Sequence, residues 1–122
     1  MWIKKGLLIQ PDKDVWWWQS HAMLPTIDHI KDDLYNVYFS GRDKNNVSQI
    51  GCAEVSVGKG EIKLNKIYGT PSLENGQRGC FDDNGVTPSC IINSDNEKKL
   101  YYIGWNSGNT TTRMSLIMGL AV

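Results

Sequence analysis

An internal repeat constrains the fold of this chain more than any other feature. Pro25 and Pro88 stand 63 positions apart, and the same offset places Tyr38 on Tyr101. The glycine-centred pattern of residues 50–53 returns at residues 118–121, after 68 positions, so the second copy carries about five more residues in the intervening loop. Repeats of this length indicate a modular fold whose units share a core.

The repeated units are expected to consist of strands. Helical periodicity is nearly absent, and 12 glycines, together with many Asn, Asp and Ser residues, interrupt the chain about every 8–15 residues. This rhythm is typical of short strands joined by turns, so we predict an all-β chain. The expected strands are Ile3–Gln10, Met23–Ile27, Leu34–Ser40, Gln49–Val55, Lys63–Tyr68, Thr87–Asn93, Lys99–Trp105 and Met114–Val122.

The second strand of each copy is apolar on both sides. Residues 34–39 and 100–103 place aromatic and aliphatic side chains at successive positions, so both faces need cover. With no helices expected, other sheets must supply that cover. Four-stranded sheets packed face to face around an axis form a β-propeller, and an irregular β-sandwich is the alternative.

Propeller geometry brings four loops to one end of the barrel. In each blade the loop entering the first strand and the loop leaving the second open on the same side. The suggestive polar and aromatic clusters of this sequence all fall in these loops, which are Trp16–Leu24, Gly41–Val47, Gly79–Val86 and Trp105–Thr112.

Composition argues against several classes of protein. Thirteen basic and thirteen acidic residues cancel without forming charged runs, which removes the electrostatic case for nucleic acid or an anionic membrane as partner. No window approaches the roughly 20 apolar residues that span a bilayer, and the N-terminus does not resemble a secretory signal. Three cysteines without metal-ligand spacing predict buried thiols in a cytoplasmic protein, and no metal or cofactor is expected.

A family resemblance follows from the order of several motifs. The motifs, in chain order, are Trp18–Ala22, Pro25, Tyr38–Asp43, Ile50-Gly51, Gly79–Val86, Pro88, Tyr101–Asn106 and Gly119–Ala121. With these motifs the sequence resembles the N-terminal part of glycosidase-like five-bladed β-propeller proteins, which are related to the arabinanase, xylosidase and fructosidase families. The resemblance covers nearly the whole chain.

The resemblance implies catalytic carboxylates at the mouth of a central tunnel. Glycoside hydrolysis needs at least two, one to protonate the leaving oxygen and one to activate water or attack the sugar. Asp82 and Asp83 are the candidates, although Asp-Asp-Asn-Gly also reads as a turn. The 63-residue offset matches them with Gln19 and Ser20, so the first copy lacks acids there, and a third carboxylate would have to come from a third blade.

Sugar-binding candidates lie in the same loops. Several of them also have a structural interpretation. For His21, which the offset matches with Asn84, it is a hydrogen-bonded packing role. For Arg42-Asp43 it is a turn with a local ion pair, and for the tryptophans it is core packing. At least one residue of the Trp16–Trp18 run should pack and another can be exposed. The substrate-binding candidates are His21, Arg42, Asn84, Trp105, Asn106 and Trp18.

Two units are too few to close a propeller. We expect one domain over residues 1–122, with blades at 16–70 and 79–122 and the strand of residues 1–10 completing the second blade, which otherwise has three strands. A homo-oligomeric ring then closes the fold, with a trimer favoured and a dimer possible. The alternative is a piece of a longer propeller. The expected function is carbohydrate interaction, with hydrolysis only if carboxylates converge across subunits; the alternative is a structural or protein-interaction module.

Overall fold

The chain folds into strands joined by turns. The computed structural model describes residues 1–108 and 114–122, and every regular element within them is a strand. The prediction of an all-β chain is therefore confirmed. No helix in this described part has the length and apolarity to cross a membrane. The strands are β1 (Ser20–Lys31), β2 (Leu34–Arg42), β3 (Ser48–Gly58), β4 (Glu61–Ile67), β5 (Gly85–Ser94), β6 (Glu97–Asn106) and β7 (Ser115–Ala121).

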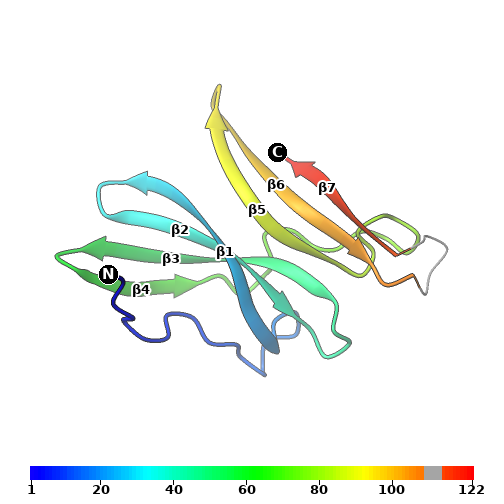
Figure 1. Cartoon of the computed structure of the whole chain (residues 1–122), viewed down its shortest axis with the longest axis horizontal. Helices are drawn as coiled ribbons and strands as arrows, with labels where there is room; N and C mark the ends of the chain where they lie inside the picture. The colour runs from blue at the N-terminus through cyan, green and yellow to red at the C-terminus, as the bar shows by residue number, and fades with distance from the viewer. Residues whose placement is uncertain (109–113) are drawn as a thin grey trace.

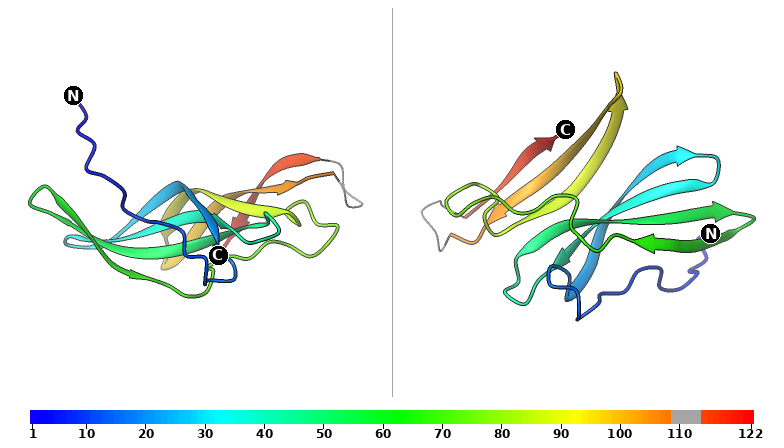
Figure 2. Two further views of the ribbon diagram at one scale, coloured as in Figure 1. Left: turned by 90° about the horizontal axis from the view of Figure 1, so that it is seen from below. Right: turned by 180° about the vertical axis from the view of Figure 1, so that it is seen from behind.

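The seven strands form one open sheet that divides into two units. The first unit consists of the antiparallel strands β1 to β4, and the second consists of the antiparallel strands β5 to β7. A single parallel pairing, Ser48 with Gly85, connects β3 to β5. Because so little pairing joins them, the units diverge from this junction, as Figures 1 and 2 show.

The internal repeat is visible in the strands themselves. β2 and β6 begin 63 positions apart, and β1 and β5 end 63 positions apart. Pro25 and Pro88 both fall where the pairing register shifts, between Met23 and Thr26 in β1 and between Pro88 and Cys90 in β5. Proline has no N–H to donate to a sheet, so a bulge is a position that tolerates it.

The repeat loses its register at the start of the first strand. Ser20 pairs with Arg42, whereas Gly85 pairs with Trp105, so Ser20 takes the position of Gly85 in the pairing. The predicted match of Ser20 with Asp83 and of His21 with Asn84 is therefore wrong. The cause is that the turn before β5 is two residues longer than the turn before β1. Strand β1 has more bulges than β5, and these restore the offset of 63 farther along the strand.

The N-terminal segment is not a strand. We expected strand structure over residues 3–10, but residues 1–10 pair with no other part of the described chain. Gly6 has a φ of 109°, a left-handed conformation that interrupts an extended segment. Trp2 is fully exposed, and only Ile9 packs against the core of the first unit. The edge strand β7 is therefore not completed by this segment.

Each unit packs an aromatic side chain against its second strand over a glycine. In the first unit Trp18 lies 4.9 Å from Phe39, between ring centroids, and directly over Gly41. In the second unit Phe81 and Tyr102 lie 6.1 Å apart, with Phe81 over Gly104. The 63-residue offset relates the packed rings, their partners and the glycines of the two units to each other. Equivalent positions therefore make equivalent contacts in the two cores.

The two units also pack against each other. Ile50 from the first unit meets Val86, Leu100 and Tyr102 from the second, and Tyr38 packs against this cluster. The apolar pattern on both sides of β2 and β6 predicted that another sheet would cover these strands. In the structure, the faces in contact include apolar residues of both strands.

A buried acid ties the two units together beside this cluster. Asp28 of β1 accepts hydrogen bonds from Asn93 and Lys98, and the Lys98 contact is also an ion pair. Because the Asp28 side chain is buried, these two donors replace the water that it would otherwise bind.

Replacing Gly41 with alanine should destabilise the protein by about 1–3 kcal/mol, the usual cost of overpacking a core. An added Cβ would lie 2.2 Å from Cδ1 of Trp18. Gly69→Ala is the matched control, because a Cβ there meets nothing within 4 Å. Urea unfolding monitored by fluorescence measures both variants. Equal midpoints for Gly41→Ala and the wild type would contradict the close approach of Trp18.

Candidate functional site

A row of directly paired residues runs across both units at one end of the sheet. Residues paired directly across antiparallel strands point to the same face, so their side chains are neighbours. The parallel pair of Ser48 and Gly85 joins the antiparallel pairs of the two units. The row joins β1, β2, β3, β5 and β6 and consists of Ser20, Arg42, Ser48, Gly85 and Trp105.

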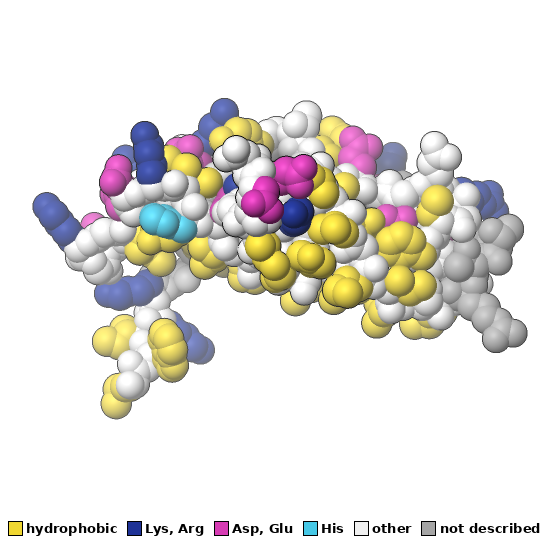
Figure 3. Space-filling view, turned by 90° about the horizontal axis from the view of Figure 1, so that it is seen from above, with side chains coloured by type: hydrophobic (Ala, Val, Ile, Leu, Met, Phe, Trp, Pro, Cys, Tyr) yellow, Lys and Arg dark blue, Asp and Glu magenta, His cyan; other side chains and the backbone are white. Residues whose placement is uncertain are grey.

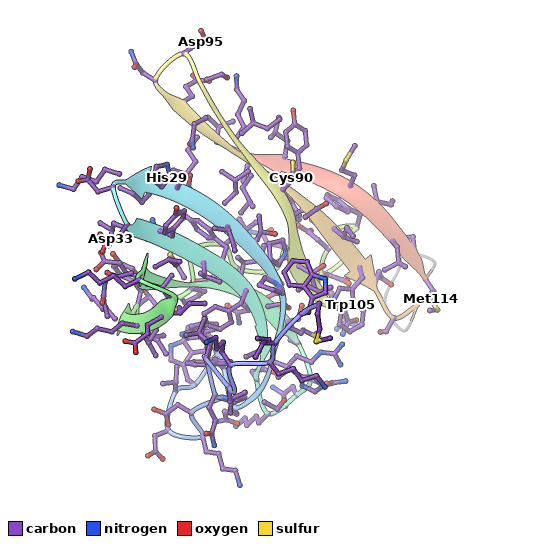
Figure 4. The ribbon with its side chains drawn as sticks, turned by 60° about the vertical axis from the view of Figure 1, so that its left-hand side comes forward. His29, Asp33, Cys90, Asp95, Trp105 and Met114 are labelled. Atoms are coloured by element: carbon purple, nitrogen blue, oxygen red, sulfur yellow. The ribbon has the colours of Figure 1, made fainter. Side chains whose placement is uncertain are left out.

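Trp105 and Arg42 meet in this row. The guanidinium carbon of Arg42 lies 5.5 Å from the centroid of the Trp105 ring, which is within the range of a cation–π contact. The 63-residue offset relates these residues, so equivalent positions of the two copies stack on each other. Figure 4 shows Trp105 near the place where the two groups of strands come together.

Ser48 and Gly85 position the Trp105 ring. The indole Nε1 of Trp105 donates to the hydroxyl of Ser48 at 3.3 Å, and that hydroxyl donates to the carbonyl of Val86 at 2.8 Å. A Cβ on Gly85 would lie 2.3 Å from Nε1 of Trp105 and 2.6 Å from Oγ of Ser48. Glycine at this position is therefore what permits the contact between the units.

Arg42 makes few contacts besides the one with Trp105. Its Nη1 donates to the side chain of Asn46 at 2.8 Å, while its Nε is buried without a hydrogen-bond partner. The Asp43 carboxylate instead accepts from the backbone N–H groups of Asn45 and Val47. The turn predicted for Arg42-Asp43 is thus confirmed, but the local ion pair predicted with it does not form.

Asp82 lies in the interior of the second unit. Its carboxylate accepts a hydrogen bond from the Tyr102 hydroxyl at 3.2 Å, and its carbonyl accepts from the N–H groups of Gly76 and Gly85. Burial, together with the charge and the hydrogen bond of Asp82, raises the pKa of Tyr102. Asp82 therefore holds the loop onto the core and is not displayed at the end of the sheet.

Asp83 belongs to a polar cluster around the loop that precedes β5. Asn106, which is only 1% exposed, donates its side-chain amide to one carboxylate oxygen of Asp83, and the backbone N–H of Gly79 donates to the other at 2.8 Å. Asn84 accepts from the hydroxyl of Ser107 at 2.6 Å. The structure thus brings together three predicted site residues, Asp83, Asn84 and Asn106.

His21 and Trp18 lie differently from the other candidates. His21 is exposed, and its Nδ1 is 2.9 Å from the hydroxyl of Ser20. Trp18 is buried against Trp17 and Phe39, so the prediction that it binds substrate is corrected to a core role. Trp16 is 56% exposed, which confirms that the tryptophan run divides between packing and exposure.

Sequence reasoning missed the small residues that hold the site. Ser48, Gly85 and Asn46 all contact Trp105 or Arg42, yet none is among the residues that the sequence predicts for the site. The available signal was the offset that relates Arg42 to Trp105. It did not predict the contact, because the pairing of β3 with β5 is a tertiary feature. Residues 109–112 of the predicted site loop lie outside the described residues.

Residues 1–108 and 114–122 contain no group of three His, Cys, Asp or Glu side chains that could hold a metal ion. Cys52 is buried, which raises its pKa to about 11 and disfavours a reactive thiolate. Cys80 and Cys90 are exposed, so the prediction of three buried thiols is wrong for these two.

Comparison with known proteins identifies long relatives. No protein-family model matches the chain. It is similar to two uncharacterized proteins of Mycobacterium tuberculosis, from strain CDC 1551 / Oshkosh and strain H37Rv, with 39% identity to each over 121 residues. The match covers 99% of this chain but 40% of each relative, so the chain spans less than half the length of the relatives it matches.

Replacing Asp82 with asparagine should lower the pKa of Tyr102, because it removes the negative charge beside the hydroxyl. Burial remains the larger cause, so the pKa should stay above its ordinary value of 10.0. Tyrosine Cζ chemical shifts followed against pH measure this change, with Asp43→Asn as the control. An unchanged Tyr102 titration in Asp82→Asn would contradict the hydrogen bond.

The same raised pKa has a consequence for stability. Tyr102 keeps its proton to higher pH in the folded chain than in the unfolded chain. Its contribution to stability is therefore complete below about pH 10 and is lost as pH rises through the folded-state value.

Proposed function

We propose that this chain is a carbohydrate-interacting protein of the glycosidase-like β-propeller kind. The sugar site would lie at the end of the sheet where Trp105, Arg42, Asp83, Asn84 and Asn106 gather. The observation that carries the proposal is the row that crosses both units and sets the indole of Trp105 beside the guanidinium of Arg42, which also donates to the amide of Asn46. The amide of Asn106, the next residue of β6, donates to Asp83. Flat rings flanked by hydrogen-bonding groups suit the apolar faces and hydroxyls of sugars.

Binding is better supported than hydrolysis within these residues. Asp82 is engaged with Tyr102 in the interior, which leaves Asp83 as the carboxylate of the cluster. A glycosidase needs two carboxyl groups about 5–9.5 Å apart across the scissile bond. We propose that any hydrolysis would draw its second acid from another unit that shares the same mouth.

The second unit presents an uncovered apolar face that supports propeller closure. Residues 101 and 103 of β6 lie on this face, opposite residues 120 and 118 of β7. Leu116 and Met118 are 74% and 70% exposed. Figure 3 shows hydrophobic side chains gathered toward the end of the molecule that carries the grey residues.

The repeat suggests what covers this face. Tyr101 corresponds to Tyr38, which in the first unit packs against the second unit. By the same geometry the second unit would pack against a further sheet. The 121 matched residues form 40% of each relative, which corresponds to about 300 residues, or about five units of 63. Further units in one polypeptide would meet this need, and so would further copies of this chain in a ring, with three copies giving six blades.

A structural or protein-interaction module is the second candidate function. The exposed aliphatic face favours it directly, because exposed apolar patches of this kind mark interaction surfaces. In that case the polar row at the end of the sheet would serve only to join the units.

Replacing Trp105 with alanine should abolish saccharide binding, because the ring is the apolar surface of the proposed site. Calorimetric titration with a panel of mono- and oligosaccharides measures this, and Asp83→Ala should weaken binding at least tenfold. Trp16→Ala is the matched control, since Trp16 is exposed outside the row. Undiminished sugar binding in both site variants would overturn the carbohydrate proposal and leave the interaction module.

Replacing Met118 with lysine should disrupt self-association, because the lysine charge would be buried where a second copy covers the apolar face of the second unit. Light scattering coupled to gel filtration measures the mass of the 122-residue chain and of the variant. We expect the wild type to have the mass of a trimer or dimer and the variant that of a monomer. A monomeric wild type would exclude the homo-oligomeric ring and favour closure by units of a longer polypeptide.

A further inference from the structure

Arg42 is a half-buried cation that forms no ion pair with a carboxylate of the described residues. Within residues 1–108 and 114–122 the ion pairs join Lys98 to Asp28 and Lys99 to Glu97, and Arg42 takes part in neither. Removing a charge from water without a counter-ion is costly, so a partly buried and unpaired guanidinium needs an explanation.

The donors of Arg42 are only partly used. A guanidinium carries five N–H groups in a rigid fork. One Nη1 hydrogen is donated to Asn46, and one face of the group lies over Trp105. The Nε N–H is buried and has no partner. The group is thus held in place by Asn46 and Trp105, while its Nε N–H has no acceptor among the described residues.

The neighbouring groups that the structure describes offer Arg42 no compensating charge. The Ser48 hydroxyl is engaged with Trp105 and Val86, and the Ser20 hydroxyl contacts His21. The Asp43 carboxylate caps its own turn through backbone N–H groups. What the row lacks is therefore an anion that can accept two parallel hydrogen bonds from a fixed guanidinium fork.

We infer that Arg42 binds the oxyanion of an acidic sugar and thereby makes the site selective for charged over neutral saccharides. This inference rests on the proposed carbohydrate function and names the ligand class. The oxyanion is a carboxylate, as in a uronic acid, or a phosphate, as in a sugar phosphate. Either one accepts bidentate hydrogen bonds, while the sugar ring lies against the exposed part of Trp105.

Titration calorimetry with matched ligands tests this selectivity. The probes are glucuronate against glucose, galacturonate against galactose, glucose 6-phosphate, and inorganic phosphate alone. At least one acidic sugar should bind tenfold or more tightly than its neutral partner. Raising NaCl to 0.5 M should reduce that preference, because salt screens the attraction between charges at an accessible site.

Variants of Arg42 assign the preference to this residue. Arg42→Gln should bring the affinities for acidic and neutral sugars within twofold of each other, while Arg42→Lys should retain part of the difference, because it keeps the charge but loses the fork. Lys63→Gln removes the same charge from the exposed side of β4 and should behave as the wild type. The salt dependence of the wild type is independent of whether the Arg42 variants fold.

The outcomes separate this inference from the proposed function. Equal affinities for the acidic and neutral members of every pair would overturn the inference but leave carbohydrate binding intact. Phosphate binding as tightly as glucose 6-phosphate would overturn it in favour of a simple anion site. If none of these sugars bound, both the inference and the proposed function would fail.

Discussion

The contact between the two units depends on the absence of a side chain at residue 85. Gly85 is the residue of β5 that pairs with β3, and it leaves room for the Trp105 indole to reach the Ser48 hydroxyl. That hydrogen bond fixes the ring on which Arg42 stacks. The end of the sheet that we propose as a sugar site and the junction that holds the units together are therefore the same place.

Two other contacts support this junction from the side of the core. An apolar cluster of Ile50, Val86, Leu100 and Tyr102 fills the space between the units, and the buried Asp28 accepts hydrogen bonds across it. This contact buries one face of each unit. The outer face of the second unit is not buried, and its aliphatic side chains are exposed to water. The proposed closure by further sheets follows from this imbalance.

The candidate site was partly predictable from local pattern. Asp83, Asn84, Trp105 and Asn106 were expected at one end of a sheet, because loops that enter and leave neighbouring strands meet there, and the structure places them there. Trp18 was placed wrongly, since adjacent aromatic residues do not reveal which of them is buried. Asp82 turned inward because the Tyr102 hydroxyl, 20 residues away, takes up its carboxylate.

The rhythm of turn residues predicted the all-β class and seven of the strands that form, and the repeat of 63 residues predicted that the two units share a core. These features depend on local propensity and on the alternation of side chains, which a sequence displays directly. Only the tertiary structure decided that residues 1–10 form no strand, that Ser20 takes the position of Gly85, and that Arg42 meets Trp105. Pairing between distant strands depends on bulges and close approaches, and their cost or benefit appears only when the units are packed together.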